Sequence, residues 1–275
     1  MLLGLLIALL AFVCEYVDST LGGGYGTILS PVLLLFGFSP MQIVPTILLS
    51  ELISGLLAGF FHHLEGNVNL KPTTADIFKI KNMLSPLGYM EKFRKTVPLH
   101  LKVALLLAAC SIIGTIAAVL VAVNIPEFWL KLYIGCLVLM MGIVILVCLN
   151  RQFKFSWKKI TFLGIIASFN KGMSGGGYGP VVTSGQILAG IEGKSAVGIT
   201  SLSEGLTCVV GVITYILVSK NFVDWKLAPW IIVGAVLSVP LSAKSVKIIG
   251  TKGLKLAVAI LSIILGTVTI IKTLI

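Results

Sequence analysis

Long apolar runs separated by short polar segments cover most of the chain. A helix needs about 20 consecutive apolar residues to cross a bilayer, whereas a membrane β-barrel shows only weak alternation in short segments. The unbroken length of these runs favours helices, so the pattern predicts an all-α polytopic membrane protein. Full spans are predicted at residues 41–63, 99–123, 127–149, 195–219, 227–247 and 253–271.

Two other apolar stretches, 2–37 and 158–191, are interrupted by glycine. The run Gly22-Gly23-Gly24-Tyr25-Gly26 recurs as Gly175-Gly176-Gly177-Tyr178-Gly179, 153 positions later. A glycine inside a helix costs about 1 kcal/mol relative to alanine, so each run predicts a break. Broken backbone is tolerated in a bilayer only inside protein or beside a watery cavity. Each stretch is therefore predicted to be a broken helical hairpin whose break is a candidate binding site.

The repetition extends beyond the glycines. At the same offset, Ser50-Glu51 falls on Ser203-Glu204. Residues 1–150 and 151–275 are therefore predicted to be related halves, each with one broken hairpin and three spans. A hairpin returns to its own side and three spans do not, so the second half is predicted to be inverted, as in many secondary transporters. The two glycine tips should then approach each other near the membrane midplane.

Composition and charge place the chain in a membrane. It is 57% hydrophobic and 11% charged, against about 25% charged residues in soluble domains. The formal charge of +11 comes from basic residues between the apolar runs, which indicates orientation in a lipid bilayer rather than nucleic-acid binding. A multi-pass protein of the cell membrane is predicted, with the basic loops 64–98, 150–159 and 244–255 in the cytoplasm.

The glycine breaks are candidate anion sites. A half-helix that begins after a break presents unpaired backbone N–H groups and the positive end of its dipole, which bind anions without a charged side chain. The alternative is that the glycines only allow helices to pack closely. The candidate substrate-binding residues are Gly22, Gly23, Gly24, Tyr25, Thr27, Ser50, Lys171, Gly175, Gly176, Gly177, Tyr178, Thr200 and Ser203.

Charged residues inside apolar segments are candidate coupling or gating groups. Glu51 and Glu204 lie within predicted spans, where a carboxyl group is costly and usually functional. Each could exchange a proton during transport, or could remain neutral and tie helices together. Asp18 and Lys171 each stand four residues before a glycine run. Lys171 could attract an anion or pair with Asp18 across the symmetry axis; the alternative is a capping aspartate and a snorkelling lysine.

Signatures of catalysis do not stand out in the sequence. We find no Ser-His-Asp order, phosphate loop, dinucleotide fingerprint or metal-ligand spacing. No catalytic residue, metal or cofactor is therefore expected. An anion channel is the main alternative to a transporter, and a membrane enzyme or an accessory role ranks below it.

Three motifs resemble those of a known family. Gly22-Gly23-Gly24 followed by Pro31 and Gly37 resembles the G-G-G-x₆-P-x₅-G signature of the TauE/SafE sulfite exporter family of permeases. Gly172-x-x-Gly175-Gly176-Gly177 and the segment 194–201 resemble that family's second-half motifs. The first repeat departs from the pattern, since it has Ser19 where the second has Gly172. The resemblance implies secondary transport of small sulfur-containing or carboxylate anions.

Overall fold

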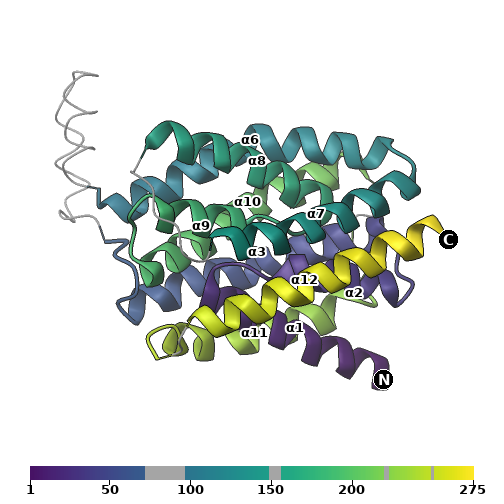
Figure 1. The fold of residues 1–275 in the computed structure, drawn as a ribbon, viewed down its shortest axis with the longest axis horizontal. Helices are drawn as coiled ribbons and strands as arrows, with labels where there is room; N and C mark the ends of the chain where they lie inside the picture. The colour runs from purple at the N-terminus through teal and green to yellow at the C-terminus, as the bar shows by residue number, and fades with distance from the viewer. Residues whose placement is uncertain (72–96, 149–155, 220–222, 249–250) are drawn as a thin grey trace.

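The computed structural model describes residues 1–71, 97–148, 156–219, 223–248 and 251–275, which form helices joined by turns (Figure 1). The prediction of an all-α fold is confirmed for this part of the chain. Its helices are α1 Leu2–Leu21, α2 Tyr25–Leu35, α3 Pro40–Leu64, α6 Leu99–Asn124, α7 Glu127–Cys148, α8 Trp157–Ser174, α9 Gly179–Leu188, α10 Gly193–Val218, α11 Ala228–Ser245 and α12 Thr251–Leu274.

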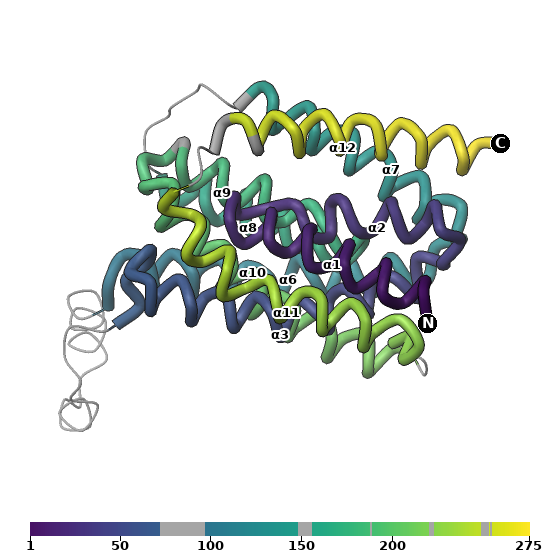
Figure 2. The backbone as a smooth tube through the Cα atoms, turned by 90° about the horizontal axis from the view of Figure 1, so that it is seen from below, coloured from purple at the N-terminus to yellow at the C-terminus, as the bar shows by residue number. Residues whose placement is uncertain are grey.

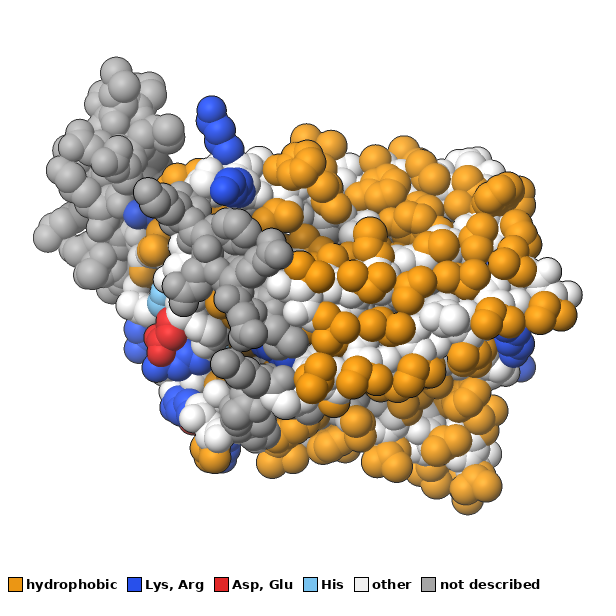
Figure 3. Space-filling model, in the orientation of Figure 1, with side chains coloured by type: hydrophobic (Ala, Val, Ile, Leu, Met, Phe, Trp, Pro, Cys, Tyr) orange, Lys and Arg blue, Asp and Glu red, His pale blue; other side chains and the backbone are white. Residues whose placement is uncertain are grey.

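Seven of the described helices are long and apolar enough to cross a membrane: α1, α3, α6, α7, α10, α11 and α12. The six predicted full spans agree with six of these helices to within about three residues at each end. In Figure 3, hydrophobic side chains cover the middle of the visible face, while Lys and Arg side chains lie toward its ends. This surface suits a lipid bilayer.

Helices of the first half pack in pairs against helices of the second half. α1 packs along α11, and α8, which is the counterpart of α1, packs along α6. The helices α3 and α10 pack on each other, as do α7 and α12. Both chain ends lie at one end of the molecule (Figure 2). The relation of the two halves, their inversion across a bilayer and the boundary near residue 150 stay predictions.

Small residues allow the central helices to approach closely. A Cβ atom on Gly55 of α3 would lie 3.0 Å from the Cα atom of Gly205 on α10. One on Gly142 of α7 would lie 2.7 Å from the carbonyl oxygen of Ala259 on α12. Such contacts are typical of helix packing in membranes, so the packing explanation holds for these glycines outside the two repeated runs.

The repeated runs break helices, as predicted. α1 ends at Gly22, where φ is 75°, and α8 ends at Gly175, where φ is 73°. Both values lie in the left-handed region, which glycine adopts without steric cost. The short helices α2 and α9, with 11 and 10 residues, follow the breaks.

Much of the predicted basic segments lies outside the described residues, at 72–96, 149–155 and 249–250.

Candidate functional site

The two glycine breaks touch each other in the interior. A Cβ atom on Gly26 would lie 1.7 Å from the carbonyl oxygen of Gly175, and one on Gly179 would lie 2.5 Å from the Cα atom of Gly23. Residues 21–30 and 171–180 are all buried. Only backbone without side chains can approach this closely, so the glycines are needed for contact between the breaks as well as for the turns.

Hydroxyl groups tie each short helix to the opposite break. The Thr27 hydroxyl accepts a hydrogen bond from the Gly177 amide at 3.1 Å. The Ser30 hydroxyl donates to the Ser174 carbonyl at 2.7 Å, and Thr183 donates to the carbonyl of Gly22. Each half therefore helps to satisfy the interrupted backbone of the other, as buried polar groups require.

The expectation of unpaired amides at the start of the half-helices is wrong for Tyr25, where α2 begins. The amides of Gly22 and Gly23 cap the end of α1 by donating to the carbonyl oxygen of Asp18, and the amide of Gly175 caps α8 by donating to that of Lys171. The Tyr25 amide donates to the Asp18 carboxylate at 3.0 Å. Asp18 therefore already occupies the start of α2, where a bound anion was expected. An incoming anion needs other donors.

A buried ionic cluster lies where α3, α8 and α10 come together. The Lys171 ammonium group donates to the carboxylates of Glu51 and Glu204, the latter at 2.7 Å. The lysine side chain is 0% exposed, and the two glutamates are 3% and 5% exposed. The two glutamates of the repeat therefore share one cation, because α3 and α10 pack on each other.

Asp18 belongs to the same cluster but does not pair with Lys171 in the way considered above. One carboxylate oxygen from each of Asp18, Glu51 and Glu204 lies within 4.8 Å of the others. Such a set could in principle hold a metal ion, and no sequence spacing indicated it, since the acids come from three separate helices. The Lys171 ammonium already supplies the cation that Glu51 and Glu204 require.

Glu15 was missed by the sequence analysis. It is 2% exposed, and one of its carboxylate oxygens has no hydrogen-bond partner among the described residues. It interacts electrostatically with Asp18, Glu204 and Lys171. Its position in the sequence could have indicated it as a site residue. Glu15 lies three residues before Asp18, which puts both acids on one face of an apolar helix.

The remaining candidates lie in the interior around these two features. The Tyr25 hydroxyl is 2.8 Å from the Ser50 hydroxyl, and the Ser203 hydroxyl donates to the Thr200 carbonyl at 3.0 Å. Tyr178 is fully buried. These contacts position helices, and the role of these residues in substrate binding stays a prediction.

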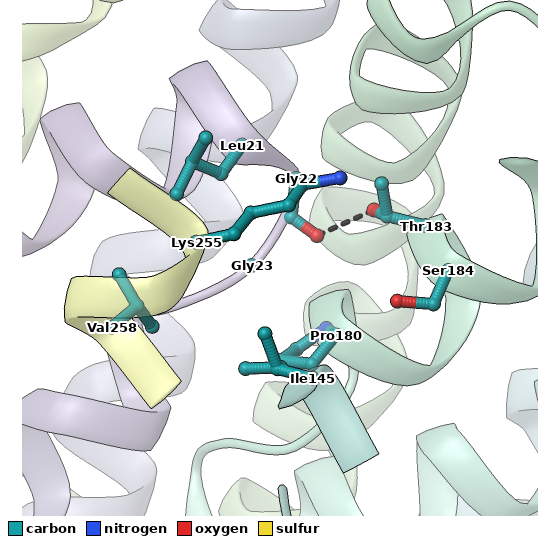
Figure 4. Close-up of a pocket in the computed structure, with 9 residues that line it drawn as sticks. All are labelled: Leu21, Gly22, Gly23, Ile145, Pro180, Thr183, Ser184, Lys255 and Val258. Atoms are coloured by element: carbon teal, nitrogen blue, oxygen red, sulfur yellow. Dashed lines mark hydrogen bonds between the residues drawn. The ribbon is translucent and has the colours of Figure 1, made fainter. Parts of the chain in front are cut away.

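A small cavity lies beside the first break (Figure 4). It is lined by Gly22 and Gly23, by Thr183 and Ser184 of α9, and by Lys255 of α12. Figure 4 shows the Lys255 side chain extending across Gly22 toward Thr183. The cavity volume is about 20 Å³, enough for roughly one water molecule. The predicted site residue Thr200 lies behind this lining: its hydroxyl is 2.8 Å from that of Thr183.

Lys255 was not among the predicted site residues. It belongs to the basic segment 244–255, which was predicted to be a cytoplasmic loop. Its side chain instead reaches the break through the packing of α12 on the rest of the helices. Position along the chain does not reveal which way such a long side chain points.

Membrane-spanning helices around a buried ionic cluster, with two broken helices meeting in the interior, define a multi-pass membrane transporter. A family model described as "Sulfite exporter TauE/SafE" matches residues 7–75 and 80–269, so the chain belongs to this family. It is 24% identical over 254 residues to "Probable membrane transporter protein YtnM" of Bacillus subtilis (strain 168), covering 87% of this chain and 73% of that protein. No solved structure matches significantly.

Proposed function

We propose that this protein is a secondary transporter of small sulfur-containing or carboxylate anions, such as sulfite or a sulfonate, and that it is coupled to protons. The observation that carries the proposal is the direct contact of the two glycine breaks beside a cavity lined by Lys255. Asp18 and Lys171 of the buried cluster lie in the last turns of the helices that end at these breaks. Family membership supports transport as the activity.

The substrate site lies between the breaks. The Lys255 ammonium and the hydroxyls of Thr183 and Ser184 all line the cavity, and charge-assisted donors of this kind suit an anion with several oxygens. The cavity is too small for such an anion, so binding requires α9 to move away from the first break. The hydrogen bond from Thr183 to Gly22 is the contact that must open.

The acid cluster is the coupling site. Glu15, Asp18, Glu51 and Glu204 are all buried, and Lys171 is the buried cation among them. Like charges in a medium of low dielectric constant disfavour simultaneous ionisation. The cluster therefore holds protons, and it releases them when movement of α3 or α10 changes the pairing with Lys171.

The sidedness of the protein follows from the positive-inside rule. The end of α3, the start of α8 and the end of α11 lie at the end of the molecule opposite to both termini (Figure 2). The described residues of the basic segments 64–98, 150–159 and 244–255 adjoin these helix ends. This end of the molecule is the cytoplasmic end, and both termini lie outside.

Counterflow in proteoliposomes tests the substrate site. Labelled sulfite uptake should saturate and should accelerate when the vesicles contain unlabelled sulfite, whereas chloride should not compete. Lys255→Met should raise the KM for sulfite about 10- to 100-fold, because it removes a charge-assisted donor. Lys194→Met, at an exposed ion pair with Glu192, is the matched control.

Two outcomes would overturn the assignment. Ohmic single-channel currents without counterflow would identify an anion channel. Equal KM values for Lys255→Met and Lys194→Met would move the substrate site away from the breaks.

The proton requirement predicts a separate effect at Glu204. Glu204→Gln should remove uptake driven by a pH gradient, while counterflow at equal pH on both sides continues, since the substrate cavity is unchanged. Glu192→Gln, at an exposed glutamate, should leave both rates as they are. Uptake that ignores pH but depends on sodium would replace the proton by an alkali ion.

A further inference from the structure

A second and larger cavity lies at the opposite end of α12. It is bounded by the end of α2, the start of α7 and the last turns of α12, near the chain's C-terminus (Figure 1). Its volume is about 240 Å³, which corresponds to roughly eight water molecules at their liquid volume. A small oxyanion fits there together with some of its hydration shell.

The polar side chains lining this cavity include two ammonium groups. Lys131 and Lys272 line it, together with Thr269 and Thr273. The Lys272 ammonium donates to the Leu35 carbonyl at 3.0 Å, which uses one of its three N–H groups. The Thr273 hydroxyl donates to the carbonyl of Thr269 at 2.7 Å.

One nearby carboxylate opposes an anion there. The Glu127 carboxylate lies 2.7 Å from the Lys131 ammonium. Their side chains are 52% and 37% exposed, respectively. An ion pair as exposed as this is worth little, so Lys131 remains available to a ligand.

Thr269 provides an independent sign of a ligand. It is 2% exposed, and its hydroxyl has no hydrogen-bond partner among the described residues. A buried hydroxyl without a partner is unfavourable, and such groups in native proteins usually meet a water or a ligand. Thr269 is one of the residues that line the cavity, so a rotation of its side chain toward a bound oxyanion would supply the missing partner.

The two cavities lie at opposite ends of the same pair of packed helices, α7 and α12. Lys131 is the fifth residue of α7, and Lys255 is the fifth residue of α12. Ile145 and Thr269 are likewise the nineteenth residues of these helices. Lys255 and Ile145 line the cavity at the break, whereas Lys131 and Thr269 line the larger one. The same pair of packed helices therefore presents a lysine at each of its ends.

We propose that the larger cavity is a second oxyanion site, which receives sulfite or a similar small anion. The anion accepts hydrogen bonds from the Lys131 and Lys272 ammonium groups and from the Thr269 hydroxyl. Only the identity of the anion rests on the proposed function, since binding here does not require transport.

Calorimetric titration of sulfite into the purified protein in detergent tests this site. The wild type should bind at two sites. The double variant Lys131→Met/Lys272→Met should lose one of them or weaken it more than 10-fold, and Lys255→Met should affect the other. Lys226→Met, an exposed lysine that precedes α11, should bind as the wild type does.

Thr269→Val separates a binding role from a structural one. It keeps the side-chain shape and removes the unpartnered hydroxyl, so sulfite affinity at this site should fall several-fold while thermal stability stays equal or rises. Wild-type binding by both the double lysine variant and Thr269→Val would overturn the proposal. Two-site binding without any vesicle transport would overturn the proposed function and leave this site standing.

Discussion

Replacing Lys171 by methionine is expected to abolish transport and to lower the free energy of unfolding by about 3–5 kcal/mol. The substitution leaves Glu51 and Glu204 buried without their cation, and removing one partner from a buried ion pair has a cost of this size. Sulfite counterflow and thermal unfolding of the purified protein measure the two effects. Lys158→Met, at an exposed position on the same helix, is the control.

A triple variant separates stability from function. Adding Glu51→Gln and Glu204→Gln to Lys171→Met removes the two buried carboxylates that lost their cation, so most of the lost stability should return. Transport should remain absent, because the proton-exchanging groups are gone. Wild-type transport by Lys171→Met alone would show that the cluster only holds helices together, which is the alternative that the sequence left open for the glutamates.

Gly26→Ala is expected to prevent folding, with a destabilisation on the order of 3 kcal/mol or more, as for severe overpacking. The added Cβ atom would lie 1.7 Å from the Gly175 carbonyl oxygen, which belongs to backbone and has no flexible side chain to move. The yield of monodisperse protein and its unfolding temperature measure the effect. Gly193→Ala and Gly253→Ala meet nothing within 4 Å and should be tolerated.

Comparing Gly26→Ala with Gly193→Ala tests whether the two breaks touch. A Gly26→Ala protein that folds and transports as well as Gly193→Ala would mean that the two breaks do not touch. If Gly26→Ala folds but transports nothing, the breaks touch during the transport cycle and are separable in the resting state.

Several features could be predicted because they depend on local physics. Apolar run length set the spans, and the helices α6 and α10 begin and end within about two residues of their predicted limits. The glycine runs predicted the breaks at Gly22 and Gly175, because no other residue adopts a left-handed conformation as easily. The cost of a buried carboxyl group identified Glu51 and Glu204 without any knowledge of their neighbours.

Partners of these groups could not be predicted, since they are far apart in the sequence. Lys171 meets Glu51 from 120 positions away and Glu204 from 33 positions away. Which residue satisfies an interrupted backbone is equally nonlocal: Thr27 accepts from the amide of Gly177, 150 positions away. The sequence therefore predicted unpaired amides where the fold supplies partners.

The sequence by itself determined that this chain is a helical membrane protein with broken helices and with acidic residues inside its apolar segments. These properties follow from hydropathy and from backbone preferences, which are local. Only the tertiary structure decided that the breaks touch, that one lysine serves two glutamates, and that Lys255 reaches the first break. Those facts depend on how α3, α8, α10 and α12 pack, and packing between distant helices is not recorded in the spacing of residues along the chain.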